Sequence, residues 1–292
     1  MVISASRRTD LPAWYGRWFR QRLEEGFARY TNPFSGTEYQ VSLTRESVIA
    51  FLFWSKDFAP FMSELEHLEE LGYPFYCHFT ITGLPVVMEP AAPPWSDAVE
   101  CFAHCANRFG PHRMCWRFDP IVLTSDISSE DTVRRFAGLA ERLAGYTESC
   151  HISFVDAYRK VKSRLAALSV IDPPGPEMSE LAERLAEIAS GRGMQVYACC
   201  EPSLVSSRIA ASHCLDLDLL RRITGNPLLS LPRRPTREGC GCFASRDIGA
   251  YDTCPSGCAY CYANTDMEKA RRHLRSHQPD APNLLGTATR NE

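Results

Sequence analysis

The sequence predicts an α/β fold on a parallel sheet, curled into a full or partial (β/α) barrel of about six strands. Three observations favour it. Short apolar runs recur from Val2 to Glu201, helical patterns lie between them, and 292 residues can bury one large core. Strands that alternate with helices indicate parallel pairing, and right-handed crossovers curl such a sheet toward a barrel. A doubly wound open sheet remains an alternative, because periodicity cannot decide closure.

Six runs have the length and composition of buried strands. They are rich in apolar, β-branched and aromatic residues. The runs are 2–6, 48–55, 75–82, 114–121, 151–156 and 195–201.

Helical patterns with an apolar face fill the intervals between these runs. The predicted ranges are 11–25, 58–71, 96–109, 130–143 and 177–190, followed by two short patterns over 204–212 and 216–223. Asp10 and Ser96 are candidate N-caps of the first and third helices. Gly191 is the expected stop of the helix before the sixth strand.

The same pass along the chain divides it into four segments. Residues 1–223 form the barrel core, and 224–238 are a Pro-rich connection. Residues 239–274 are a cysteine-rich loop that we expect to fold back over the barrel. The polar residues 275–292 are expected to be a disordered tail.

Composition and charge exclude several classes of protein. The formal net charge of −3 gives no global electrostatic case for binding nucleic acid or a membrane surface. The local basic run 233–237 is expected to be a solvated loop. No apolar stretch is long enough to cross a bilayer. We therefore expect neither a membrane nor a nucleic-acid partner.

The chain has 13 cysteines, and its first residues lack the pattern of a signal peptide. A cytoplasmic location follows as the expectation. Thiols stay reduced there, so clustered cysteines indicate metal binding or catalysis rather than a disulfide framework.

Cys254, Cys258 and Cys261 form a C-x3-C-x2-C motif, which is the strongest chemical signal in the chain. Three thiolates on one loop can bind three irons of a 4Fe-4S cluster and leave the fourth iron open to a small molecule. A structural zinc site needs four ligands and usually shows paired C-x2-C knuckles. A ferredoxin run is C-x2-C-x2-C-x3-C, which differs from this spacing. The motif favours an open cluster, with zinc or plain core thiols as alternatives.

These residues resemble the cluster loop of the radical S-adenosylmethionine (SAM) superfamily. The resemblance implies that SAM binds the open iron and is reductively cleaved. The resulting 5'-deoxyadenosyl radical would then abstract hydrogen from a substrate, which is unknown here. It further implies an electron donor such as flavodoxin or ferredoxin, and contact of Tyr260 with the adenine or the cluster. The string 257–263 is similar to the cluster loop of the spore photoproduct lyase branch.

Four longer strings extend the resemblance over most of the chain. They are Ile3–Asp10, Trp116–Pro120, Ile152–Asp156 and Gly239–Cys242, the last continuing to Ala263. They resemble the uncharacterised bacterial and archaeal domain-of-unknown-function family 1848. That resemblance implies an iron-sulfur protein and no known substrate. Because the motif comes late in the chain, we expect a permuted arrangement in which the cluster loop reaches the barrel mouth from the C-terminal side.

A second cysteine group precedes the motif. Its members are Cys199, Cys200, Cys214, Cys240 and Cys242. We expect Cys199, Cys214, Cys240 and Cys242 to bind an auxiliary iron-sulfur cluster, with Gly241 allowing close approach. A four-thiolate zinc site or no metal at all remain alternatives, because ligand type does not fix the metal. The remaining thiols are expected in the core: Cys77, Cys101, Cys105, Cys115 and Cys150.

Polar residues at the carboxyl ends of barrel strands are candidate site residues, because the loops converge at that face. The candidates are Arg7 and Arg8 for the SAM carboxylate or an anionic substrate, Arg117, Asp119 and Glu201 for catalysis, and Ser153 and Asp156 for hydrogen bonds to ribose or substrate.

Each candidate has a structural alternative. Asp10 could simply cap a helix while the arginines pair with acids. Arg117 and Asp119 could be a buried ion pair. His78 shares a strand face with two threonines and is by default a satisfied core residue, and Lys56 could lie on the surface.

Two other functions compete with a radical SAM enzyme. One is a non-catalytic iron-sulfur electron carrier or redox sensor, and the other is a zinc-stabilised binding module. Several charged strand ends that face one cavity favour an enzyme, because a carrier needs no substrate pocket.

Overall fold

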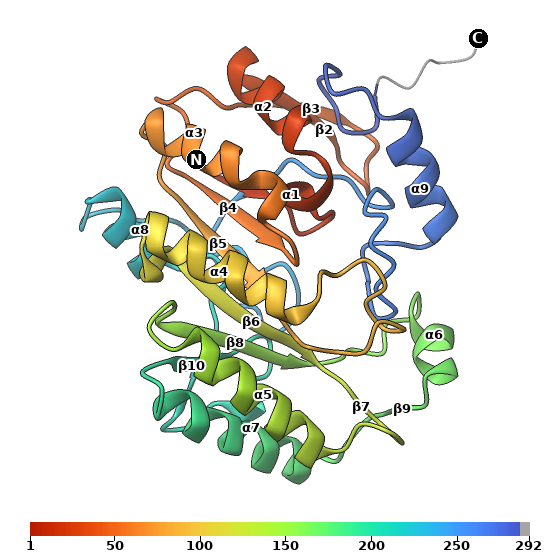
Figure 1. The fold of residues 1–292 in the computed structure, drawn as a ribbon. Coiled ribbons are helices and arrows are strands. Elements are labelled where there is room, and N and C mark those ends of the chain that lie inside the picture. Colours follow the sequence, from red (N-terminus) through yellow and green to blue (C-terminus); the bar gives the residue numbers. More distant parts are fainter. Residues whose placement is uncertain (287–292) are drawn as a thin grey trace.

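The computed structural model describes residues 1–286, and its centre is an eight-stranded sheet (Figure 1). The strands of this sheet are β1 (Val2–Ala5), β4 (Ala50–Ser55), β5 (Phe75–Thr80), β6 (Met114–Ile121), β8 (Ser149–Phe154), β10 (Gln195–Ala198), β11 (Ile209–Ala211) and β12 (Arg246–Asp247). The first six of these are the six runs that the sequence predicts. The fold class, α/β on a parallel sheet, is therefore confirmed.

The strand order is β11-β10-β8-β6-β5-β4-β1-β12, and neighbouring strands run parallel. From β1 to β11 the order in space follows the order in the chain. A doubly wound sheet reverses its order part-way, so this arrangement differs from it. Within residues 1–286, the two edge strands β11 and β12 are not paired with each other, so the sheet is not a closed barrel.

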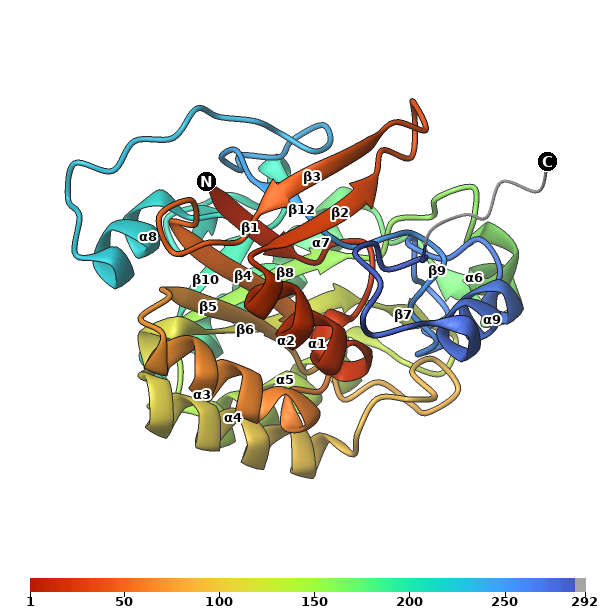
Figure 2. The ribbon, with the colours of Figure 1, turned by 90° about the horizontal axis from the view of Figure 1, so that it is seen from above.

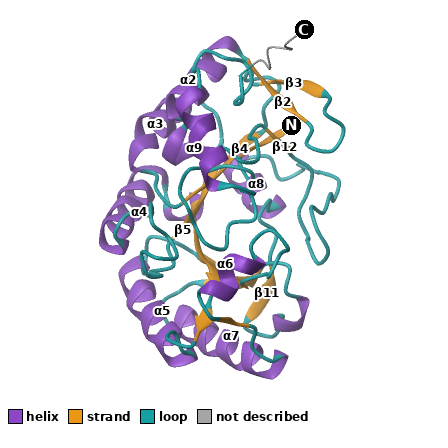
Figure 3. Ribbon diagram, turned by 90° about the vertical axis from the view of Figure 1, so that its right-hand side faces the viewer, coloured by secondary structure: helices purple, strands orange, loops and turns teal. Residues whose placement is uncertain are grey.

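Helices cover one face of the sheet (Figure 3). They are α1 (Leu11–Trp14), α2 (Gly16–Glu25), α3 (Met62–Glu70), α4 (Trp95–Phe109), α5 (Ser129–Leu143) and α7 (Gly175–Ser190). Right-handed crossovers that advance in one direction place their helices on the same side. Aromatic rings dominate this interface: Phe19 of α2 meets Phe51 and Phe53 of β4 edge-on at 5.3 and 5.4 Å between ring centroids.

A different segment covers the other face, which we call the inner face. Its apolar core includes Leu52, Tyr76 and Leu220, the last from α8 (Leu217–Thr224). Leu229 and Leu231, from the Pro-rich connection, pack on the same cluster. Figure 2 shows that connection crossing the sheet on the side opposite α3 and α4.

Smaller elements complete the described chain. Two antiparallel pairs lie outside the main sheet, β2 (Phe27–Thr31) with β3 (Glu38–Ser42) and β7 (Leu123–Thr124) with β9 (Val170–Ile171). The remaining elements are α6 (Lys162–Ala167), α9 (Met267–Ser276) and the 3-10 turns η1 (Ala59–Phe61), η2 (Pro111–Arg113) and η3 (Pro202–Leu204). No helix within residues 1–286 has both the length and the apolar character to span a membrane.

The structure corrects several helix predictions. The helix predicted over 204–212 is wrong: this segment begins at the last residue of η3 and contains strand β11, which pairs with β10. The first predicted helix is divided at Tyr15 into α1 and α2, although Asp10 does cap α1. Ser96 lies inside α4, whose N-cap is Pro94. Parallel pairing along β10 outweighs the weak helical spacing of the 204–212 run.

Residues 275–286 pack on the fold, although the composition predicts a disordered tail from 275. Trp18 Nε1 donates a hydrogen bond to Ala281 O at 2.8 Å, and Leu284 is buried. Asn283 forms a β-bridge with Arg29. Residues 287–292 of the predicted tail lie outside the described residues.

The carboxylate of Asp247 joins the C-terminal segment to the first strand. It accepts hydrogen bonds from Ser4 Oγ at 2.7 Å, Ser6 Oγ at 2.8 Å, Arg7 N at 2.8 Å and Gly249 N at 2.9 Å. The approach is so close that a Cβ on Gly249 would lie 2.1 Å from Ser6 Oγ. Only glycine fits at this position.

We expect Asp247→Ala to lower the free energy of unfolding by roughly 2–4 kcal/mol, because four donors lose a charged acceptor. Asp218→Ala is the control, since its side chain is 89% exposed and pairs with Arg221 on the surface. The control should cost under about 1 kcal/mol. Urea unfolding of both variants measures the difference, and equal losses would contradict the role assigned to Asp247.

Candidate functional site

The cysteine motif lies over the carboxyl ends of the first strands of the sheet. Trp14 Nε1, in α1 after β1, donates to Ser256 Oγ at 2.8 Å. Ala259 N donates to Met88 O, in the loop after β5, at 2.9 Å. In Figure 1 the blue C-terminal segment runs along the side where the strands end. The loop therefore reaches this face of the sheet from the far end of the chain.

The three motif thiols are withdrawn from water. Cys254 and Cys258 are buried, and Cys261 is half-buried. Burial raises the pKa of Cys254 to about 12, and it also raises the pKa of Cys258 and Cys261. Thiolates at this position need a compensating positive charge, which a bound metal supplies while it displaces the thiol protons.

The three motif sulfurs are not all as close together as the ligands of a one-metal site. Two sulfurs on one tetrahedral zinc lie about 3.8 Å apart, given Zn–S bonds of about 2.3 Å. Among residues 1–286, one group of three His, Cys, Asp or Glu residues has all its ligand atoms within 4.8 Å of one another. The three motif cysteines are not that group. Each thiolate of a 4Fe-4S cube binds a different iron, so its ligands stand further apart.

A buried ion pair lies beside the motif. Lys56 Nζ, after β4, contacts Glu89 Oε1 at 2.9 Å, and both side chains are mostly buried (15% and 6% exposed). Glu89 Oε1 also accepts from Thr82 Oγ1 at 2.7 Å and from the Tyr260 hydroxyl. Burial alone would raise the pKa of Glu89, but Lys56 and the two hydroxyl donors hold it below its usual value.

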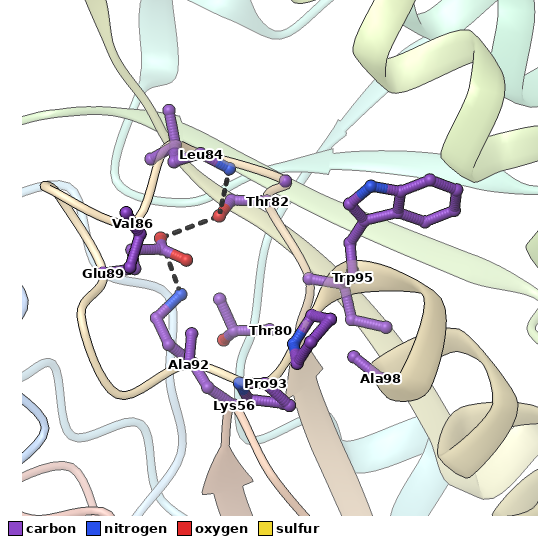
Figure 4. A pocket seen from close by; sticks show the side chains of 13 residues that line it. Lys56, Thr80, Thr82, Leu84, Val86, Glu89, Ala92, Pro93, Trp95 and Ala98 are labelled. Atoms are coloured by element: carbon purple, nitrogen blue, oxygen red, sulfur yellow. Dashed lines mark hydrogen bonds and ion pairs between the residues drawn. The ribbon is translucent and has the colours of Figure 1, made fainter.

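Two cavities meet at Lys56. The larger, of about 250 Å³, is lined by Thr80, Thr82, Glu89 and Trp95 among others, and Figure 4 shows Lys56 and Glu89 pointing toward each other at its edge. The smaller, of about 220 Å³, is lined by Asp10, Trp14 and Lys56 among others and reaches Ser256 of the motif. Polar groups therefore converge on space next to the cysteine loop, which is typical of a binding site.

The second cysteine group also comes together. Cys199 Sγ, after β10, lies 3.6 Å from Cys214 Sγ, and Cys214 exchanges a further thiol hydrogen bond with Cys242. Cys240 Sγ accepts from Cys242 N at 3.5 Å. The four thiols that the sequence selects are thus neighbours. Gly241, however, packs against His213, where a Cβ would lie 2.2 Å from Nδ1.

Two buried arginines stand beside this group. Arg117 donates from Nη1 to Cys214 Sγ at 3.3 Å. Arg7 lies 4.8 Å over the Trp54 ring, and its Nη2 is buried without a hydrogen-bond partner. Hydrogen bonds from Cys199 and Cys242, together with Arg117, hold the pKa of Cys214 well below its usual value. The surroundings therefore favour an anionic centre.

Three of the polar candidates form one network on the inner face. Arg117 pairs with Asp119, and Ser153 Oγ donates to Asp119 Oδ1 at 2.5 Å. Glu201 Oε1 accepts from Phe154 N at 3.2 Å, close to the same strand ends.

Two candidates lie apart from this network. Arg8 lies over the rings of Tyr30 and Tyr251 and contacts Gly249 O at 3.5 Å. Asp156 pairs with Arg237 at a more exposed position. Their roles in cofactor binding stay predictions that these contacts do not support.

Residues 2–263 match the family described as "Domain of unknown function (DUF1848)". The chain belongs to this family. The match confirms the family that the four sequence strings predicted. No curated protein and no solved structure matches the chain. The radical SAM resemblance and the likeness to spore photoproduct lyases stay predictions.

Sequence analysis misses several residues of this candidate site. Glu89 lies in a loop with no motif around it, so no sequence signal marks it. Sequence analysis assigns Lys56 no role, yet its position directly after a buried strand is a usable signal. Cys115 was predicted to be a plain core thiol; it is buried, but it faces His78 and His151 on the inner face. Alternation along β6 places it on the same face as Arg117.

We expect Lys56→Met to lower the free energy of unfolding of the DUF1848 chain by about 3–5 kcal/mol, because Glu89 would remain buried without its cation. Adding Glu89→Gln should recover part of that loss. Arg222→Met is the control, because its partner Glu148 is half-exposed. It should cost under about 1 kcal/mol. Denaturant unfolding of the wild type, Lys56→Met, Glu89→Gln and the double variant gives the coupling energy of the pair. Losses that simply add would contradict a buried ion pair.

Proposed function

We propose that this DUF1848 protein is a radical SAM enzyme with a 4Fe-4S cluster held by Cys254, Cys258 and Cys261. One observation carries the proposal: three thiols on a single loop, two buried and one half-buried, lie over the strand ends, beside cavities that share a mostly buried lysine. When bound, such a cluster supplies a SAM-binding iron and the electron for reductive cleavage. A flavodoxin or ferredoxin-type protein would deliver that electron. The substrate is not assigned.

The residues around the motif fit an anionic cluster. Lys56 lies close enough to Cys258 for their charges to interact, so it can offset the charge of a thiolate-bound cluster. The Lys56–Glu89–Tyr260 network fixes the loop from the sheet side. Arg164 of α6 fixes it from the other side by donating to Cys261 O at 3.0 Å, and Figure 2 shows α6 beside the C-terminal segment. A loop held at several points changes little when it binds a cofactor.

The inner face would hold the organic ligands. The Arg117–Asp119–Ser153 network presents a cation, a carboxylate and a hydroxyl near the strand ends. These groups can orient ribose hydroxyls or a polar substrate by hydrogen bonds and keep bulk water away from them. Arg7, with a free buried Nη2, is the second cation on this face.

We further propose that the curved sheet is the wall of a partial (β/α) barrel of six main strands, with the cluster loop permuted to the C-terminal side. The unbroken spatial order from β1 to β10 supports this arrangement. The C-terminal segment would then occupy the mouth that an N-terminal loop occupies in the more usual order.

The second cysteine group is proposed as an auxiliary iron-sulfur site at Cys199, Cys214, Cys240 and Cys242. The 3.6 Å between Cys199 Sγ and Cys214 Sγ fits two thiolates on one metal atom. A 2Fe-2S cluster places two thiolates on each iron, whereas a four-thiolate zinc ion brings all four sulfurs to about 3.8 Å from one another. Among the described residues, no three sulfurs of this group lie within 4.8 Å of one another, which favours the cluster. Metal analysis separates the two.

Electron paramagnetic resonance of anaerobically reconstituted, dithionite-reduced protein tests the catalytic cluster. We expect a cluster signal that shifts when SAM is added. The shift and that signal should be lost in the Cys254→Ala/Cys258→Ala/Cys261→Ala variant and kept in Cys101→Ala, whose thiol lies in α4. A signal that ignores SAM would favour an electron carrier, and stoichiometric zinc without iron would favour a zinc-stabilised module.

Iron content of the same loop variant tests the auxiliary site. We expect residual iron in the loop variant and its loss when Cys199→Ser and Cys214→Ser are added. Zinc in place of that residual iron would assign the second group to zinc. A loop variant without either metal would refute a metal at the second group.

A further inference from the structure

A third group of ligand-type side chains lies on the inner face, and neither cysteine motif includes it. His78 of β5, Cys115 of β6 and His151 of β8 have ligand atoms that all lie within 4.8 Å of one another. All three residues are buried. They come from three adjacent strands of the sheet, so their backbone positions are fixed by strand pairing.

Hydrogen bonds orient both imidazole rings toward the group. His78 Nε2 lies 2.7 Å from Cys214 O, and a carbonyl can only accept, so Nε2 carries the proton. His151 Nδ1 bonds Ser212 Oγ at 2.9 Å, which leaves Nε2 of that ring for another partner. Metal-binding histidines are oriented in this way, with one nitrogen bonded to a carbonyl or other polar group and the second nitrogen free.

One atom of the group has no partner. Nδ1 of His78 is buried and makes no hydrogen bond. With Nε2 protonated, Nδ1 has a lone pair directed into the protein interior. A satisfied core histidine, the default expectation for this residue, would not leave a buried acceptor unpaired. A metal ion bound to this lone pair would give the buried Nδ1 of His78 a partner.

Stacking against aromatic rings holds the planes of both imidazoles. The centroid of the Trp54 ring lies 5.3 Å from that of His78, and the centroid of Tyr197 lies 5.1 Å from that of His151.

We propose that His78, Cys115 and His151 bind one divalent transition-metal ion, with Zn²⁺ the best match to two imidazoles and one thiolate. Borderline-soft ions prefer this mixture of nitrogen and sulfur ligands. Three protein ligands leave one coordination position for water or a small ligand, as in catalytic zinc sites. The inference does not depend on the radical SAM proposal, because none of its ligands belongs to the two cysteine groups.

The site is adjacent to the second cysteine group. The carbonyl that orients His78 belongs to Cys214, and Arg117 donates to the Sγ of the same cysteine at 3.3 Å. The paired carboxylate of Asp119 offsets the charge of this arginine. A metal at His78 would therefore hold the backbone of Cys214 in place for the second group.

Cobalt(II) titration of metal-stripped full-length protein tests the site, because a Co²⁺–thiolate bond has a distinct charge-transfer absorption. The spectrum of the Co²⁺-loaded wild type minus that of Cys115→Ser should show the charge-transfer band of one Co²⁺–thiolate bond. Cys115→Ser should also bind one Co²⁺ per chain fewer than the wild type. The matched control is Cys150→Ser, which removes a buried thiol of neighbouring β8 that belongs to the helix-side core. It should bind Co²⁺ like the wild type.

Further variants separate this ion from the other cysteines and from misfolding. The Cys115-dependent band should persist in the Cys254→Ala/Cys258→Ala/Cys261→Ala background. His151→Gln should weaken Co²⁺ binding at the site at least ~10-fold, the usual cost of disturbing a metal ligand. Circular dichroism checks that each variant is folded. If folded Cys115→Ser or His151→Gln binds as much Co²⁺ as the wild type, with the same spectrum, the proposed site is overturned.

Discussion

The position of the cysteine loop depends on one carboxylate. Asp247 accepts four hydrogen bonds, three of them from β1 and the residues that follow it. They join the short strand β12 to the edge of the sheet, and the motif begins a few residues later. A two-residue strand has little stability of its own, so the charged hydrogen bonds and the close approach of Gly249 must hold it. That contact fixes where the segment leaves the sheet, and the hydrogen bonds of Trp14, Tyr260 and Arg164 then hold the loop over the strand ends.

Compensation of buried charge organises the rest of the inner face. Lys56 pairs with Glu89, Arg117 pairs with Asp119, and both pairs lie next to cysteines. A buried cation without a partner is strongly unfavourable, and a buried thiol does not ionise readily. When a cation lies next to a thiol, the thiolate form is stabilised and the buried cation gains a partner of opposite charge. The first cysteine motif thus lies over the strand ends, and the second cysteine group and the His–Cys group lie on the inner face.

The sequence predicted the six main strands, because alternation and aromatic content mark them, and it placed Arg117, Asp119 and Ser153 on a common face. It also predicted the second cysteine group, chiefly because cysteines are so frequent in that part of the chain. It failed where the decisive contact is remote in the chain. Part of the 204–212 segment, Ile209–Ala211, forms strand β11 because its backbone pairs in parallel with β10. Glu89 gains its role from Lys56 and Tyr260, which are far from it in sequence.

The sequence by itself determined the alternation of strands and helices, the family, and the three cysteines of the motif. These depend on local spacing, which the order of residues contains directly. Only the tertiary structure decided that the loop docks on β1, that Lys56 and Glu89 form a pair, and that Cys115 meets two histidines. Those contacts join residues from separate strands and loops. The parallel sheet fixes their spacing through crossover connections, and no local pattern records which side chains the crossovers bring together.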